Sequence, residues 1–552
     1  MSALRVSRGF AWTQLYKMVE YGALVLYGIL VSRHFGPEIG GNYAVYLAFT
    51  GTLGIISAFA VDGVLLRYVP RVARGELEFG HLKVEGVRHF MLNLFAFRLL
   101  VTLVICVFVA LLLGVLPNLY VSFGASLGSI HLLWPWIVVF LIGQCAVSFA
   151  TFTLIGLLQV KWVFYASLIV RFTMLGTGLL LLQIGNLSVE WAVALHALAA
   201  VLNGCLLLYW VNHHVEPHTS PGLRKEIRHL AGTVRRFVRK PGYLRVFVGL
   251  PFMVYGITTW GSDILTTVIG RQPDILMLRA ILGENARDIG LYNTAASIVL
   301  MAEYIFLFGL GGTLVSVFSE LAHQDEAGGS KPGGHFPLLG KARKDVAGFQ
   351  AVMTAPLFGF MLVFTPLIVQ VLYGWKFAGA SPMVMLGLGI TACSVVIFGG
   401  GMQVTSLVVI GKASVVFKNR LAWGVMNLIA NYFLIRRFGG IGAMLGSQLA
   451  NAGACATEGV LARRWIGSSF NPWRIAEILL IVSVSVLCSY GVEQILPHET
   501  PALVRLLIAA AIMVGLTAGG YILFRIPDAR QVFDRMRALF MSKRERRVKP
   551  QG

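Results

Sequence analysis

Charged side chains stand inside long apolar stretches of this sequence, where a charge is costly. Eight of them are Lys17, Glu20, Arg98, Arg171, Asp263, Arg271, Asp274 and Glu303. An ionised group at the centre of a bilayer costs about 2.5 to 3.5 kcal/mol, so such groups usually face a partner or a water-filled cavity. Basic groups at such depth can bind an anion, whereas acidic groups can bind a proton or a sodium ion.

The basic members are candidate contacts to an anionic head group. They are Lys17, Arg98, Arg171 and Arg271. A guanidinium can hold phosphate oxygens through two parallel hydrogen bonds, and Arg98 and Arg171 lie too deep in their predicted helices for easy snorkelling. Each has a structural alternative. Helix-end carbonyls or an acid such as Asp62 can satisfy either arginine, and Lys17 can reach the membrane surface or pair with Glu20 three residues on.

The acidic members are candidates for ion coupling or for structural pairing. They are Glu20, Asp263, Asp274 and Glu303. A carboxylate at membrane depth can carry a proton or a sodium ion through a transport cycle. Asp274 can equally pair with Arg271 or Arg279, so both roles stay open for it.

Other polar groups in the apolar stretches are expected to be structural. Glu458 is expected to pair with Arg463 or Arg464, and His196 to be a satisfied packing residue. The six cysteines show no CxxC or Cys/His ligand spacing, so neither disulfides nor a metal site are predicted. No GxxxxGK[ST] loop and no paired carboxylates in outer connections occur, so we expect no catalytic residues and no cofactor.

The elements that hold these residues are predicted to be membrane helices. The 552 residues are 57% hydrophobic and 13% charged, against about 45 to 50% and about 25% in soluble domains. A crossing helix needs about 20 apolar residues. Fourteen stretches qualify: 10–32, 42–66, 90–116, 132–157, 162–183, 190–211, 247–281, 289–317, 347–372, 382–410, 419–435, 441–462, 474–496 and 503–524. The longest, 247–281, holds Gly270 and Pro273 and is expected to kink or break.

The distribution of basic residues predicts the orientation in the membrane. With the amino terminus inside, 35 of the 46 Lys and Arg residues fall in inner segments and seven in outer segments, which follows the positive-inside rule. Both termini are therefore expected in the cytoplasm. The same rule accounts for the net charge of +21, so no nucleic-acid partner is expected. The amino terminus is expected to form the first membrane helix and not a removable signal peptide.

The two halves of the sequence carry a similar motif. HFGPEIGGNYAVYLA occupies 34–48, and ILGENARDIGLYNTAA occupies 281–296. Each reads Gly, a short polar stretch with an acid, Ile-Gly, and a Tyr that opens the next helix. Six predicted helices separate the copies, so the repeats are expected to be parallel, with a substrate site between two bundles.

These strings resemble the polysaccharide biosynthesis family of Wzx-like oligosaccharide flippases, in the MOP superfamily that includes the MATE exporters and lipid II flippases. The resemblance reaches to about residue 465. FGPEIGGNY carries it, together with GLP at 249–251, PDILMLRAILGENARDIGLY at 273–292, PLIVQVLYGWKFAGA at 366–380 and LIRRFGGIGAMLGSQLAN at 434–451. Family members often show an acid at the position of Asp274.

The resemblance implies an all-α, MOP/MATE-like membrane fold of about 14 transmembrane helices. The expected domains are a six-helix bundle at 1–211, a basic cytoplasmic loop at 212–245, a second six-helix bundle at 246–465, two extra helices at 466–524 and a basic tail at 525–552. It also implies alternating-access flipping of a polyprenyl-pyrophosphate-linked oligosaccharide across a bacterial inner membrane. Membrane lipids, coupling H⁺ or Na⁺, and other polysaccharide-assembly proteins are the partners it implies.

Two other functions stay open at this point. A MATE-like exporter of cationic drugs or metabolites shares the helical core, and its cavity would favour acids over arginines. A membrane glycosyltransferase, polymerase or ligase of the same pathway would need a sizeable outer loop with catalytic groups, and the predicted outer connections are short. We expect the protein to be a flippase and not an enzyme.

Overall fold

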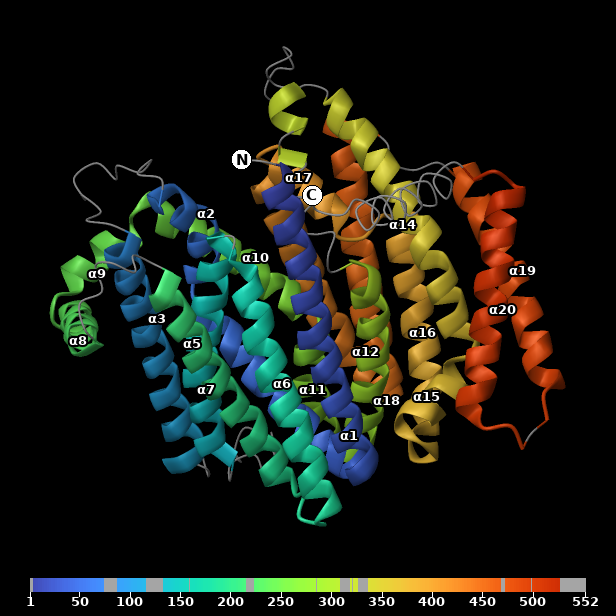
Figure 1. The fold of residues 1–552 in the computed structure, drawn as a ribbon, viewed down its shortest axis with the longest axis horizontal. Coiled ribbons are helices and arrows are strands. Elements are labelled where there is room, and N and C mark those ends of the chain that lie inside the picture. The colour runs from blue at the N-terminus through green and yellow to red at the C-terminus, as the bar shows by residue number, and fades with distance from the viewer. Residues whose placement is uncertain are drawn as a thin grey trace, which may run out of the picture. The chain divides into compact units, whose positions relative to one another are not determined.

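The computed structural model describes residues 3–73, 87–115, 133–157, 159–214, 223–283, 285–307, 318–319, 321–325, 336–467, 472–497 and 499–526. These residues are almost entirely helical and contain no strand, which confirms the predicted all-α class (Figure 1). Nine segments among them are long and apolar enough to cross a membrane. Nearly all of the predicted basic tail lies outside the described residues, as does the end of the predicted span 289–317.

The chain divides into two compact units. Unit 1 comprises Met1–Asn293 and Asn427–Ala443, and unit 2 comprises Thr294–Met426 and Met444–Gly552. The helices that begin in unit 1 are α1 (Ala3–Ala58), α2 (Val61–Ala73), α3 (Val87–Val109), η1 (Ala110–Val115), α5 (Trp134–Gly156), α6 (Val160–Gln183), α7 (Val189–His214), α8 (Leu223–Arg239), α9 (Pro241–Val248), α10 (Pro251–Val268), α11 (Arg271–Leu282) and α12 (Ala286–Leu307). The predicted domain bounds stay a prediction.

Unit 2 is built from the later helices. They are α14 (Pro337–Val363), α15 (Thr365–Tyr373), η3 (Trp375–Ala380), α16 (Ser381–Ala392), η4 (Cys393–Ile397), α17 (Met402–Val409), α18 (Ala413–Ile466, apart from 427–443), α19 (Pro472–Ile495) and α20 (Ala502–Leu523). The last two helices pack against each other and against α14. They correspond to the predicted extra pair at 474–496 and 503–524.

Two helices run through two predicted spans each, and a glycine separates the spans. Gly36 has φ 77° within α1, and Gly439 has φ 55° within α18. Both values lie in the left-handed region that favours glycine. Each glycine therefore kinks the helix between two predicted spans, but the count of fourteen spans stays a prediction.

Four predicted spans are interrupted, and in one of them, 347–372, Phe364 separates α14 from α15. The break expected in 247–281 is confirmed, since α10 ends at Val268 and α11 begins at Arg271. The span predicted over 382–410 is broken, because Gly399 and Gly400 have φ of 76° and 50° and separate η4 from α17. The span predicted over 42–66 also breaks, because Ala60 has φ 69° between α1 and α2.

The predicted repeat motifs contact each other within unit 1. A Cβ atom on Gly41 would collide with the carbonyl oxygen of Ala286, and one on Gly290 would collide with the carbonyl oxygen of Pro37. The two contacts are reciprocal. Gly41 stands four residues after Pro37, which meets Gly290, and Gly290 stands four residues after Ala286, which meets Gly41. The motifs therefore pack face to face at these glycines, where only the absence of a side chain permits the approach.

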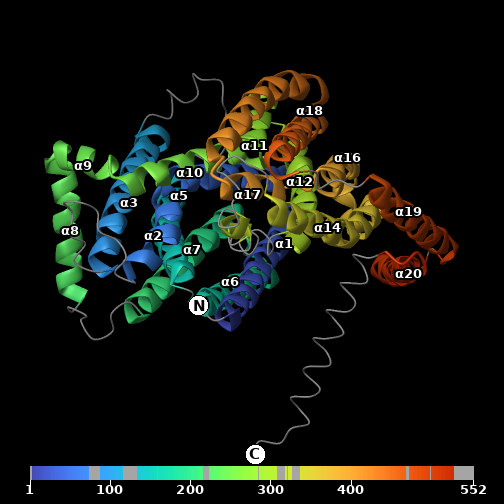
Figure 2. The same ribbon diagram turned by 90° about the horizontal axis from the view of Figure 1, so that it is seen from above.

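The predicted basic loop at 212–245 is helical where it is described. The apolar residues of α8 lie on one face of the helix and its basic residues lie on the opposite face. This pattern is typical of a helix at a membrane surface. Phe237 of α8 is buried and lies 6.0 Å from Phe97 of α3 between ring centroids. α8 is seen nearly end-on in Figure 1 and lengthwise in Figure 2, so it lies across the direction of α3.

We predict that Gly290→Ala destabilises the protein, whereas Gly176→Ala does not. The new methyl group at position 290 would meet the Pro37 carbonyl, and overpacking costs about 1 to 3 kcal/mol. Gly176 also lies in a helix but has nothing within 4 Å of its would-be Cβ atom. Thermal unfolding of the detergent-purified variants measures the difference. Equal melting temperatures would show that the two motifs do not touch.

Candidate functional site

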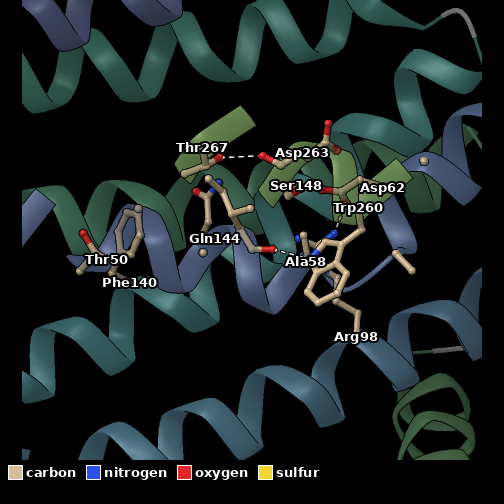
Figure 3. A pocket seen from close by; sticks show the side chains of 15 residues that line it. Thr50, Ala58, Asp62, Arg98, Phe140, Gln144, Ser148, Trp260, Asp263 and Thr267 are labelled. Carbon is tan, nitrogen blue, oxygen red and sulfur yellow. Dashed lines mark hydrogen bonds and ion pairs between the residues drawn. The ribbon is translucent and has the colours of Figure 1, made fainter. Parts of the chain in front are cut away.

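A polar cavity of about 300 Å³ lies within unit 1 (Figure 3). It is bordered by the end of α1 and the start of α2, with α3, α5 and α10 completing its walls. The polar side chains that line it are Thr50, Asp62, Arg98, Gln144, Ser148, Trp260, Asp263 and Thr267. Two of the predicted site residues, Arg98 and Asp263, therefore meet in one cavity.

The break at Ala60 positions the cavity's main carboxylate. Asp62 lies in the first turn of α2 because α2 begins at Val61, directly after that break. The amino-terminal end of a helix carries partial positive charge, which stabilises a carboxylate there. Strained backbone at a non-glycine residue persists only where the surroundings enforce it, so the bend is part of how the site is built.

Arg98 forms an ion pair with Asp62. Nη1 of Arg98 donates to Oδ1 of Asp62, and the hydroxyl of Ser148 donates to Oδ2 at 2.8 Å. The Arg98 side chain is 1% exposed, while that of Asp62 is 21% exposed. Asp62 is the partner that the sequence offered as the structural alternative for Arg98. The pair belongs to the cavity wall, and the carboxylate is its more accessible member.

Asp263 is the second carboxylate of the cavity. It is exposed on α10, and no basic side chain pairs with it among the residues that the structure describes. The hydroxyl of Thr267 donates to its backbone carbonyl at 2.9 Å. Figure 3 shows Asp62, Ser148 and Asp263 close together. The cavity thus carries two carboxylates and one guanidinium, and its formal charge is negative.

The remaining basic candidates lie outside this cavity. Nη2 of Arg171 is 3.7 Å from Oε1 of Glu20, so the arginine on α6 and the acid on α1 form an ion pair. Lys17 donates to the hydroxyl of Tyr21 at 3.5 Å and lies 5.1 Å from the ring centroid of that residue. Glu20, which the sequence predicted as a possible partner of Lys17, therefore pairs with Arg171.

Asp274 is fully buried at the start of α11. It accepts hydrogen bonds from the hydroxyl of Tyr292 and, at 2.7 Å, from Nδ2 of Asn431. Tyr292 is the tyrosine of the second repeat motif. The sequence analysis gave Arg271 or Arg279 as a possible partner, which stays a prediction, and it missed Tyr292 and Asn431, although the repeated tyrosine was a signal for the first.

Unit 2 holds a separate buried ion pair that the sequence assigned wrongly. Glu458 is paired with Arg420, through Nε at 2.6 Å and Nη2 at 2.9 Å, and not with Arg463 or Arg464, which are exposed. The wrong prediction considered only the close neighbours of Glu458 along the chain, whereas Arg420 lies 38 residues away, before the break at Gly439 in α18. Such bidentate geometry holds two helical segments together.

Two other predicted residues lie apart from the cavity. Glu303 lies on α12 and contacts Thr391 of α16, both in unit 2. The ring of His196 stacks on Phe140 with centroids 5.0 Å apart, which confirms a packing role. Its Nδ1 is buried without a hydrogen-bond partner among the described residues, so the expectation that the histidine is satisfied stays a prediction.

These features define a multi-pass helical membrane protein with a charged cavity among its helices. The chain belongs to the polysaccharide biosynthesis protein family, whose model matches residues 6–322. No curated protein sequence matches the chain.

Solved structures of similar fold are flippases and transporters. Lipid II flippase MurJ in an inward closed conformation is 13% identical, with a TM-score of 0.61 over 95% of this chain and 100% of its own. An inward-facing multidrug resistance MATE family transporter of the MOP superfamily is 16% identical, with a TM-score of 0.55 over 83% of this chain and 94% of its own. A eukaryotic MATE transporter, AtDTX14, is 12% identical, with a TM-score of 0.52, covering 87% and 99%. The predicted MOP/MATE-like fold is confirmed.

We predict that Arg98→Met destabilises the protein and that adding Asp62→Ser largely reverses the loss. Removing one partner leaves the other charge unpaired, and for buried pairs this costs about 3 to 5 kcal/mol. The partial exposure of Asp62 places the expected loss near the lower end, about 3 kcal/mol. Thermal unfolding of the single and double variants measures it. A double variant as unstable as Arg98→Met would contradict the pairing.

Proposed function

We propose that this protein flips a polyprenyl-pyrophosphate-linked oligosaccharide across a bacterial inner membrane by alternating access, for the synthesis of a surface polysaccharide. The observation that carries the proposal is a buried guanidinium, Arg98, at the wall of a polar cavity in a chain of the polysaccharide biosynthesis family. A pyrophosphate that leaves the head-group region needs cationic hydrogen-bond donors to replace its water.

In the proposed mechanism, Arg98 exchanges partners. At rest its charge is balanced by Asp62. An entering phosphate oxygen competes for the same guanidinium, and the displaced carboxylate keeps the hydroxyl of Ser148 as a donor. Because a carboxylate without its cation is costly at this depth, binding of a proton or a sodium ion at Asp62 or Asp263 would accompany the exchange. Binding of the substrate at Arg98 and binding of the coupling ion at the freed carboxylate thus favour each other.

The other candidate residues have subsidiary roles in this proposal. Lys17, Arg171 and Arg271 supply further positive charge along the path, and Glu20, Asp274 and Glu303 are further sites for the coupling ion. Other polysaccharide-assembly proteins and membrane lipids are the proposed partners. The two-bundle division at 1–211 and 246–465 describes the moving parts.

A MATE-like exporter of cationic compounds is the second candidate function. The cavity's two carboxylates outnumber its single guanidinium, and Asp263 is exposed there without a described basic partner. A negative cavity attracts a cation more readily than a pyrophosphate. The substrate assay below therefore includes a cationic arm.

We predict that Arg98→Gln slows translocation of the lipid-linked oligosaccharide by about tenfold to a hundredfold, because a charge-assisted hydrogen bond contributes about 1.5 to 3 kcal/mol. The measurement uses proteoliposomes that contain a polyprenyl-pyrophosphate oligosaccharide and an impermeant glycosidase outside. Arg464→Gln, which makes the same substitution at an exposed arginine, is the control, and this variant should translocate the substrate at the normal rate.

The same proteoliposomes separate the two candidate functions. A flippase exposes the oligosaccharide at a rate that Arg98→Gln lowers, and it does not export ethidium. Ethidium export that depends on Asp263, with no exposure of the oligosaccharide by the intact protein, would replace the flippase proposal by the exporter.

We further propose that both termini lie in the cytoplasm. The proposal predicts that alkaline phosphatase, which is active only outside the inner membrane, is active when fused after Asn186 and inactive when fused after His214. Asn186 follows α6, and His214 ends α7, so one crossing separates the fusion points. The reverse pattern of activity would overturn this orientation.

A further inference from the structure

A second polar pocket, of about 380 Å³, lies in unit 2 at one end of the extra helix pair. The end of α19 and the start of α20 form one side of it, and α15 with η3 forms the other. In the orientation proposed above, this end is the outer face. None of the site residues predicted from the sequence lines this pocket.

The floor of the pocket is an ion pair with no net charge. Arg505 of α20 donates to Oε1 of Glu493 of α19, and Gln494 donates to Oε2 at 2.8 Å. The Glu493 side chain is 6% exposed and that of Arg505 is 18% exposed. Because the two charges cancel, a phosphate or a cation gains little here. The same groups still offer both donors and acceptors to a neutral ligand.

The rim of the pocket is aromatic. Trp375 of η3 is 74% exposed and Tyr490 of α19 is 43% exposed. An aromatic face carries negative partial charge, so it attracts the polarised C–H groups on the face of a sugar ring. Exposed tryptophans also mark membrane interfaces in general. Trp473, which is 81% exposed at the opposite end of α19, is such a residue and lines none of the cavities described here.

We propose that this pocket binds a neutral saccharide, the glycan part of the translocated lipid, after it reaches the outer face. A sugar ring fits both features at once: its hydroxyl groups donate to Glu493 and accept from Gln370 and Gln494, while its C–H face packs on Trp375. The inference rests on the proposed function for the identity of the glycan. It assigns the extra helices α19 and α20 a role in holding the released glycan, separate from the cavity at Arg98.

Saturation-transfer difference NMR on the full chain in nanodiscs tests the proposal. The probes are the methyl glycosides of glucose, galactose, mannose and N-acetylglucosamine at millimolar concentration. We expect saturation of ring protons of at least one glycoside, reduced about fivefold in Trp375→Ala, in line with the strength of an aromatic contact. Trp473→Ala is the matched control and should keep the full signal. Gln494→Ala should weaken binding without touching the aromatic rim.

The outcomes separate this inference from the proposed function. No saturation of any glycoside, or equal signals from the intact protein and Trp375→Ala, overturns the saccharide site even if the proteoliposomes still flip their substrate. Line broadening of inorganic phosphate by the intact protein that Arg505→Gln removes would also overturn it, in favour of an anion site. Saccharide binding that Trp375→Ala abolishes supports the site even in a protein that fails to translocate.

Discussion

The ion pair between Arg98 and Asp62 is the interaction on which the proposed account depends. Arg98 is 1% exposed, and burying its charge without a partner inside an apolar helical unit would destabilise the protein. The carboxylate of Asp62, which accepts a hydrogen bond from the hydroxyl of Ser148, offsets this cost. Replacing such a pair by apolar groups is often neutral or stabilising, so stability alone does not explain its presence. Its place at the wall of a polar cavity suggests the explanation, since a charge that must be neutralised at rest can bind an anion when its partner is displaced.

The backbone around the pair is shaped by small residues and by breaks in helices. The bend at Ala60 turns the chain so that Asp62 opens α2, and Gly63 and Gly256 let α2 and α10 approach, since a Cβ on either would meet the other helix. Farther along, Gly41 and Gly290 bring the repeat motifs into reciprocal contact. These positions share one property: each needs either a positive φ or the absence of a side chain. The cavity therefore depends on residues that carry no chemistry themselves.

Apolar length and glycine position predicted most of the fold. The helices α6, α19 and α20 begin and end within two residues of their predicted bounds, because a bilayer fixes the length of a crossing helix. The break at Ala60 could not be predicted, since alanine is a strong helix former and only its packed surroundings hold it at positive φ. The pairing of Glu458 with Arg420 was also out of reach, because it needs the register of two segments 38 residues apart. Site residues found by charge alone proved a mixed group: Arg98 and Asp263 share a cavity, whereas Glu20 and Arg171 pair elsewhere.

The central claim is that the Arg98–Asp62 pair faces water at membrane depth, and cysteine labelling tests it most directly. In a variant without the native cysteines, Gln144→Cys lies in the cavity lining, and Leu180→Cys lies on an exposed apolar face of α6. Only a hydrated thiol ionises and reacts with a membrane-impermeant maleimide, so we expect labelling at position 144 to be at least about tenfold faster than at position 180. Equal resistance to labelling at both positions would mean that the pair is dry, and the proposed exchange of Asp62 for phosphate would then fail.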